Sequence, residues 1–348
     1  MMNKKIYVLS ATQISMQKPL SEEWMSCPIA YSEPFVRSIN PSFNGYVSPN
    51  EMRRIGVVLK RAIATSTEAL KQSGLPTVDA IFTGTGYGCI ENSELFLDVM
   101  CREGEDLQKP TCFMQSTHNT ISSMVAIQTK NHGYNVTYSH KGVSFDSALL
   151  DAWTQFRLNM IRSALVGGFD EMTPSFFQIL KRGGVFDEGT ILCGEAAVSI
   201  VLGDNDEGHR ALCMLTGFKM LYRPSLETMK DAVRQLLENA GKRMSDVDAV
   251  LTGMNGCEDT DNANLSEAKA MFGDRPLLKY KHIFGESMTS SGLGFYAAAS
   301  CLKSGFIPSA MFVDDADISG SKPHCIILYN RSDGNNYSIT LIESCGDY

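Results

Sequence analysis

An internal repeat constrains the fold more than any other feature of this sequence. Residues 75–88 (LPTVDAIFTGTGYG) and 244–256 (MSDVDAVLTGMNG) share one order: a polar turn, the string VDA, apolar strand residues, then Thr-Gly and a glycine-rich turn. An amphipathic helix precedes each copy, at 63–72 and at 226–238, and a glycine just beyond each helix suits its C-terminal cap. The copies lie about 169 residues apart, so the sequence predicts a duplication into two similar α/β halves.

Continuous apolar runs elsewhere indicate strands that are buried on both faces, as in a layered α/β fold. The polar, turn-rich stretch 203–209 (GDNDEGH) is the expected seam between the halves. We therefore expect an N-terminal half at residues 1–205 and a C-terminal half at residues 206–348. The predicted strands are 6–15, 163–167, 197–202, 311–313 and 325–329, and the predicted helices are 147–160, 265–272 and 294–303.

The composition argues against several classes of protein. With 43% hydrophobic residues the chain can bury a large core, yet no apolar run approaches the roughly 18 residues of a membrane span. The start of the chain (MMNKKIYVLSAT) predicts a first core strand rather than a signal peptide. The net charge of −8 is spread out, which argues against a nucleic-acid partner. The ten cysteines show no CxxC pair and no metal-ligand spacing, so we expect a cytoplasmic protein without metal or cofactor.

Residues 134–152 (YNVTYSHKGVSFDSALLDA) are the best candidate for a reactive segment. A β-branched and aromatic run ends at a short polar turn, and a helical pattern begins at about Phe145. Several enzyme classes place a nucleophile at such a turn, because the free N–H groups and positive dipole end of the helix stabilise a thiolate or oxyanion. No cysteine lies in this turn, so the function depends on how that absence is interpreted.

These motifs, in this order, resemble those of the β-ketoacyl synthases of the thiolase superfamily along nearly the whole chain. The resemblance implies an α/β, thiolase-like fold: a duplicated five-layer αβαβα sandwich, almost always dimeric. That fold agrees with the repeat. The matching segments are the opening strand at 6–15, TGTGYG at 83–88, PTCFMQSTHN at 110–119 (at the dimer interface in the family), VGGFDE at 166–171 and FDEGTILCGEAAVSIVL at 186–202.

The resemblance implies decarboxylative Claisen condensation, in which an elbow cysteine takes an acyl chain from acyl carrier protein and two histidines support decarboxylation of a malonyl unit. Matching the strand places the nucleophile position at His140, whereas matching back along the helix from Gly167 places it at Gly142. Neither register gives a cysteine. The nearest hydroxyl groups are those of Ser139 and Ser144.

Both histidine positions of the family are changed as well. Asn255 stands in place of the histidine of the family's A-H-G-T motif, and Glu286 in place of that of K-x-x-x-G-H, whose lysine is retained as Lys281. An amide cannot transfer protons as imidazole does, and an ionised carboxylate would oppose the charge of an enolate. The late glycine loop of the family is echoed at 317–322 (DISGSK). By resemblance the site comprises His140, Ser144, Asn255, Lys281 and Glu286.

Several side chains near these positions have a structural interpretation. His140 is a substitute nucleophile or base, or else a polar residue of the turn. We interpret Cys257, in the glycine turn beside Asn255, as a small buried residue rather than a displaced nucleophile. His282 lies on a strand-like segment, where its side chain points away from that of Lys281. Residues 258–261 (EDTD) lack the ligand alternation of a calcium loop and predict a solvated turn.

Two classes of function remain open. The first is a non-catalytic partner resembling the chain-length factor, a degenerate homologue that completes a ketosynthase dimer and shapes its acyl tunnel in fatty-acid, polyketide or polyene-type synthesis. Its partners would be an active ketosynthase, or a second copy of itself, and acyl carrier protein. The second is an enzyme: an acyltransferase, thioesterase or malonyl decarboxylase using Ser144 or His140 with a Lys281–Glu286 pair, or an active β-ketoacyl synthase whose elbow is misaligned.

Overall fold

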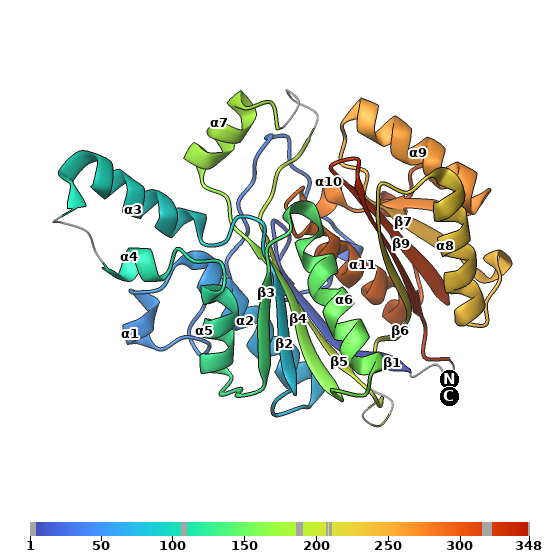
Figure 1. Cartoon of the computed structure of the whole chain (residues 1–348), viewed down its shortest axis with the longest axis horizontal. Coiled ribbons are helices and arrows are strands. Elements are labelled where there is room, and N and C mark those ends of the chain that lie inside the picture. The colour runs from blue at the N-terminus through green and yellow to red at the C-terminus, as the bar shows by residue number, and fades with distance from the viewer. Residues whose placement is uncertain are drawn as a thin grey trace.

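The strand order of the computed structural model repeats one arrangement twice (Figure 1). The structure describes residues 5–105, 110–185, 191–206, 208, 211–314 and 322–346. Ten strands of the described residues follow the order β3-β2-β4-β5-β1-β6-β10-β9-β7-β8, so the second five mirror the first five. The strands are β1 (Ile6–Ile14), β2 (Ala80–Gly84), β3 (Tyr134–Tyr138), β4 (Ser163–Asp170), β5 (Ala196–Gly203), β6 (Cys213–Tyr222), β7 (Ala249–Thr252), β8 (Leu277–Lys279), β9 (Cys325–Ser332) and β10 (Asn336–Glu343).

The strand directions repeat too. In the first half, β2 pairs in parallel with β3 and β4, and β5 pairs antiparallel with β4 and β1. In the second half, β7 is parallel to β8 and β9, and β10 is antiparallel to β9 and β6. Three residue pairs of the described structure join β1 to β6, so the sheet divides there into two five-stranded parts. The predicted duplication is therefore confirmed, whereas the boundary at 205/206 stays a prediction.

Helices form three layers, one between the two parts of the sheet and one outside each. The central helices α6 (Ser144–Arg157) and α11 (Ser290–Ser304) share one apolar cluster with the inner faces of both parts. Helices α2 (Val57–Ser73) and α5 (Thr120–Gln128) cover the outer face of the first part, and α8 (Leu226–Asn239) and α9 (Glu258–Phe272) cover that of the second. Figure 1 shows the resulting five layers, as predicted.

Shorter elements connect these layers. The remaining α-helices of the described residues are α1 (Pro49–Met52), α3 (Ile90–Glu103), α4 (Pro110–Met114), α7 (Pro174–Arg182) and α10 (Lys281–Phe284). Short 3-10 helices lie at Glu23–Met25, Lys141–Val143, Met244–Asp246 and Ser309–Met311. Helices α3 and α4 extend away from the sheet on the side of β3, the outermost strand of the first part (Figure 1).

Sequence features explain why the central layer packs tightly. Residues 290–302 of α11 (SSGLGFYAAASCL) carry no charge and are buried on all sides, as expected for a helix enclosed by two sheets. A Cβ at Gly84 would overlap the backbone of Ser144 and Phe145, so the end of β2 touches the start of α6. At the equivalent Gly253 a Cβ would lie 2.7 Å from Asn330 Oδ1. The repeated Thr-Gly is therefore a packing requirement in both halves.

Three local predictions were wrong. Residues 311–313 do not form a strand, because Met311 ends a 3-10 helix and Phe312 makes a single bridge to Leu278. His282 lies on helix α10 rather than on a strand. Residues 258–260 are exposed, as predicted, but 258–261 form the first turn of α9 rather than an irregular turn, and acidic side chains are favoured there by the helix dipole. Residues 186–190, His209 and 317–321 of the predicted motifs lie outside the described residues.

None of the helices in the described residues is both long and apolar enough to cross a bilayer. Within the same ranges, no group of three or more His, Cys, Asp or Glu side chains is placed to hold a metal ion.

Candidate functional site

A cavity of about 320 Å³ lies between the two halves, beside the turn that precedes α6. Its walls include the loops that follow β7 and β9 and the segment between α10 and α11. Asn255, Lys281 and Glu286, three of the positions predicted by resemblance, all line it, together with Gly142. The structure thus brings the second-half positions together at the elbow of the first half.

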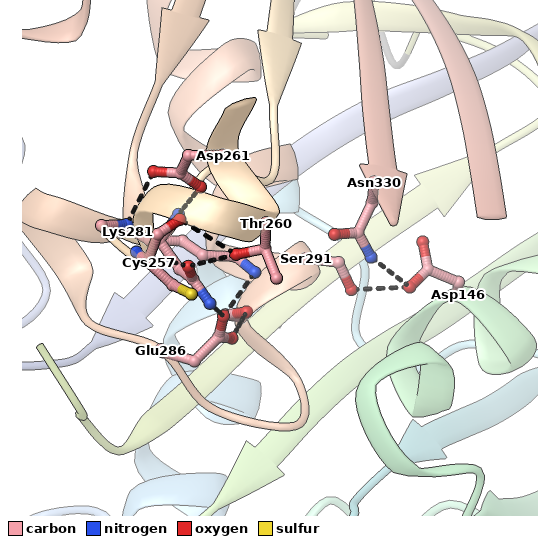
Figure 2. A network of polar contacts seen from close by, with 11 residues as sticks. Asp146, Cys257, Thr260, Asp261, Lys281, Glu286, Ser291 and Asn330 are labelled. Atoms are coloured by element: carbon pink, nitrogen blue, oxygen red, sulfur yellow. Dashed lines mark hydrogen bonds and ion pairs between the residues drawn. The ribbon is translucent and has the colours of Figure 1, made fainter. Parts of the chain in front are cut away.

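Glu286 is the centre of the polar contacts in this cavity (Figure 2). Its Oε2 accepts hydrogen bonds from Lys281 Nζ at 2.7 Å and Asn255 Nδ2 at 3.1 Å, and its Oε1 accepts one from Ser290 Oγ at 2.9 Å. The side chains of Lys281 and Glu286 are 6% and 18% exposed. A backbone bridge to Cys193 also fixes Glu286. Its carboxylate is therefore paired with one cation and held by three segments of the chain, while a fourth segment holds its backbone.

Asn255 connects Glu286 to the start of α9. Its Oδ1 accepts hydrogen bonds from the Cys257 backbone N–H at 3.1 Å and from Thr260 Oγ1 at 3.4 Å, while its Nδ2 donates to Glu286. Asp261 holds the same turn by accepting from the Asn255 N–H at 2.9 Å. Both ends of the amide are therefore used in fixed contacts, and an amide has no proton to transfer near neutral pH.

The elbow itself contains no side chain that could act as a nucleophile toward this cavity. Lys141 adopts a φ of 47°, in the left-handed region, and a 3-10 turn then leads into α6. Gly142 lies on the cavity wall. A Cβ at Gly142 would overlap the hydroxyl oxygen of Ser332, at the end of β9. If the nucleophile position of the family corresponds to Gly142, Ser332 fills the space beside that position.

His140 and Ser144 are not among the described residues that line this cavity. The buried Ser144 Oγ donates to the Lys141 carbonyl at 2.6 Å and accepts from the His140 N–H at 2.8 Å, which closes the turn. The His140 Nδ1 lies 3.1 Å from Ser147 Oγ and faces a separate surface groove beside Asp151. The structure thus separates these two predicted positions from Asn255, Lys281 and Glu286.

Cys257 lines the cavity and occupies the N-cap position of α9. The repeat explains this placement, because Cys89 occupies the N-cap position of α3 after the glycine turn of the first half. A cysteine therefore follows the glycine turn in both copies, so the repeat continues one residue beyond Gly88 and Gly256. This equivalence supports a structural origin for Cys257.

Two buried acids at the end of the VGGFDE motif hold the first glycine turn. The Asp170 Oδ1 accepts hydrogen bonds from Thr85 Oγ1 at 3.1 Å and from the next two backbone N–H groups at 2.9 Å each. Glu171 accepts one from the Glu91 N–H at 3.1 Å, at the start of α3. Burial raises the pKa of Asp170 to about 6 and that of Glu171 to about 7. Sequence reasoning noted this motif but assigned these acids no role.

The filled space beside Gly142 predicts a packing effect. Gly142→Ala is expected to lower the free energy of unfolding by about 1–3 kcal/mol, because its Cβ overlaps Ser332. In a Ser332→Gly background the overlapping side chain is absent, so adding Gly142→Ala should change the free energy of unfolding little. Urea unfolding of the four proteins measures the coupling. An equal cost of Gly142→Ala in both backgrounds would contradict the overlap.

Comparison with known proteins agrees with this geometry. A family model described as "Beta-ketoacyl synthase, N-terminal domain" matches residues 38–241, more than half of the chain. This match shows that the chain belongs to the β-ketoacyl synthase family. No curated protein matches the sequence.

Solved structures share its fold over nearly the whole length. The ishigamide ketosynthase/chain length factor matches with a TM-score of 0.82 at 16% identity, and a β-ketoacyl synthase from Burkholderia phymatum STM815 with 0.81 at 14%. A third is AntDE:AntF, a type II PKS acyl-carrier protein in complex with its ketosynthase bound to the hexaketide, with 0.79 at 15%. Each match covers 99% of this chain and 100% of the other. The fold is thus thiolase-like, as predicted.

Proposed function

We propose that this protein is a non-catalytic, chain-length-factor-like partner of an active ketosynthase in cytoplasmic fatty-acid, polyketide or polyene-type synthesis. One observation carries the proposal. The cavity at the family's site has glycine at the elbow, with Ser332 filling the space beside it, and a closed Lys281–Glu286 pair where a histidine is expected.

The chemistry of the cavity supports a loss of condensation. A ketosynthase needs a thiolate at the elbow and neutral imidazoles that donate toward the thioester oxygen. Here Gly142 supplies no thiol, and the Glu286 carboxylate already accepts hydrogen bonds from three side chains. An anion at this point would oppose enolate formation. Polar replacements of this kind carry little cost in a protein whose own site is not used, provided that they are hydrogen-bonded.

An exposed apolar surface supports a partner of the same fold. Helices α3 and α4 carry exposed Leu95, Leu97, Met100, Phe113 and Met114, and Phe96 packs against Phe113. This α3–α4 surface lies on the side of the molecule where β3, the outermost strand of the first part of the sheet, pairs only with β2 among the described strands. Exposed apolar patches of this kind typically mark protein interfaces. One of the structural neighbours is a ketosynthase/chain length factor, and another contains an acyl-carrier protein bound to its ketosynthase.

Co-expression tests the partner directly. The chain, co-expressed with an active ketosynthase encoded beside it, is expected to purify as a heterodimer. Phe113→Asp should weaken that complex at least tenfold, because it places a charge in a desolvated interface. Ile179→Asp on α7 is the matched control, since Ile179 is 60% exposed and Phe113 57%. A stable homodimer that never exchanges with any neighbouring ketosynthase would overturn the proposal.

A second candidate function, an acyl-transferring enzyme with altered chemistry, rests on one observation. Cys257 and the Lys281–Glu286 pair line the same cavity. Intact mass measurement distinguishes the non-catalytic partner from the acyl-transferring enzyme. The purified chain is first incubated with acyl- and malonyl-carrier protein. No covalent adduct is expected on this chain, whereas an active ketosynthase run in parallel should acylate. An adduct that disappears in Cys257→Ser would favour the enzyme.

A further inference from the structure

A second, much smaller cavity lies behind the site, between the central helices and the second part of the sheet. Its volume is about 10 Å³, close to what a single water molecule requires. It is lined by apolar side chains, among them those of both central helices, and by the polar residues Asp146, Tyr280, Ser291, Asn330, Ser338 and Thr340. A cavity of this size with several polar groups is hydrated in folded proteins, whereas an apolar one stays dry.

Asp146 is the charged residue on the wall of this inner cavity. It lies in the first turn of α6 and is 3% exposed. Its Oδ1 accepts a hydrogen bond from Ser338 Oγ at 2.6 Å, and its Oδ2 accepts one from Ser291 Oγ at 2.7 Å, with Asn330 Nδ2 at 3.5 Å (Figure 2). Every one of these partners belongs to the second half. Asp146 thus ties the start of α6 to α11, β9 and β10.

Tyr280 lines the same cavity as Asp146. It is 3% exposed, and its hydroxyl makes no hydrogen bond to the described residues. Ser290 lies near the hydroxyl and donates its own proton to Glu286, but the hydroxyl groups of Ser290 and Tyr280 are not placed to form a hydrogen bond with each other. The ring packs closely on Gly294, where a Cβ would lie 2.8 Å from it. A buried phenol in a fixed position needs a partner, since an unsatisfied hydroxyl is costly.

We propose that the inner cavity is a binding site for one water molecule, which bridges the Tyr280 hydroxyl and the Asp146 carboxyl group. The water accepts from or donates to Tyr280 and donates to Asp146, which gives it the two to four polar partners of a typical buried water. It completes the hydrogen bonding of the tyrosine and of the carboxyl group together. Asn330 lies on the walls of both cavities, so the inner cavity adjoins the larger one.

The water would give the fold a continuous polar contact between its halves, independent of the function proposed above. Asp146 comes from the elbow helix, whereas Tyr280 precedes α10 and lies one residue from Lys281. A shift of either segment would break the bridge. Gly142, just before α6, and Lys281, next to Tyr280, both line the larger cavity, so the bound water helps to fix the geometry of that cavity.

The sign of the stability change in Tyr280→Phe tests the proposal. With the water bound, removal of the hydroxyl breaks a hydrogen bond and lowers the urea midpoint. Without it, removal of an unsatisfied hydroxyl raises the midpoint. Tyr296→Phe is a positive control, because Tyr296 is 2% exposed and its hydroxyl donates to the Ser21 carbonyl at 3.1 Å and accepts from Trp24 Nε1 at 3.3 Å. We expect a lower midpoint in both variants, with the larger decrease in Tyr296→Phe, and an unchanged or higher midpoint for Tyr280→Phe overturns the site.

A crystal structure of the unaltered protein gives a second, independent measurement. It should show one ordered water within hydrogen-bond distance of both Tyr280 Oη and an Asp146 oxygen, and the corresponding structure of Tyr280→Phe should show that water displaced or poorly ordered. A well-ordered cavity wall without solvent density in the unaltered protein would refute the proposal, whatever the stability of the variant.

Discussion

Glu286→Ala is expected to lower the free energy of unfolding by about 3 kcal/mol, the cost of stranding one partner of a buried ion pair. Lys281 is 6% exposed and has its ammonium 2.7 Å from the Glu286 carboxylate, so the variant leaves a buried cation without its counter-charge. Asn255 Nδ2 and Ser290 Oγ lose their acceptor at the same time. Urea unfolding at pH 7 measures the loss, with the slope of the transition as a check on two-state behaviour.

Matched variants show whether the loss comes from the stranded charge. The double variant Lys281→Met with Glu286→Leu removes both charges and should regain most of the stability, because buried pairs can often be replaced by apolar side chains of similar volume. Glu227→Ala breaks the exposed pair of Lys230 and Glu227, at 3.3 Å, and should change the midpoint little. A Glu286→Ala protein as stable as Glu227→Ala would show that Lys281 does not depend on this carboxylate.

The repeat explains how much of the fold could be predicted from the sequence. Two copies of one helix–strand–glycine turn unit require two related halves, and β2 and β7 occupy equivalent places in the observed strand order. Apolar runs then identified β4, β5 and β9 because these strands are buried on both faces. The segment 311–313 has a similar apolar character but makes one bridge, since apolar content alone does not fix strand pairing.

The site could be predicted in part for a related reason. The resemblance groups Asn255, Lys281 and Glu286, and the structure places all three on the wall of one cavity, whereas their role there stays a prediction. The elbow could not be aligned from the sequence, because no sequence pattern indicates the left-handed Lys141 and the 3-10 helix that connect β3 to α6. Ser332 and Asp146 were missed, because contacts between residues 190 or more positions apart leave no local pattern in a single sequence.

The contribution of Glu171 to the stability of the folded protein is expected to fall as the pH rises from about 4.5 to about 7. Burial raises the pKa of this 1% exposed carboxyl group from 4.5 to about 7, so the folded protein binds a proton that the unfolded chain has released. Below pH 4.5 both states are protonated and the term vanishes. Above pH 7 the buried carboxylate costs the fold about 3 kcal/mol, because one unit of pKa corresponds to about 1.4 kcal/mol.

Glu171→Gln isolates this term, since a neutral amide can still accept from the Glu91 N–H and does not titrate. Measured by urea unfolding from pH 4 to pH 8, the variant should gain on the unaltered protein as the pH rises. Glu51→Gln is a control of opposite sign: the hydrogen bond from Ser48 lowers the pKa of Glu51, so the unaltered protein should gain on that variant as the pH rises through the acid range. Parallel pH profiles for Glu171→Gln and the unaltered protein would mean that Glu171 titrates as an exposed carboxyl group. Water would then have to reach the Glu171 carboxyl group beside the start of α3.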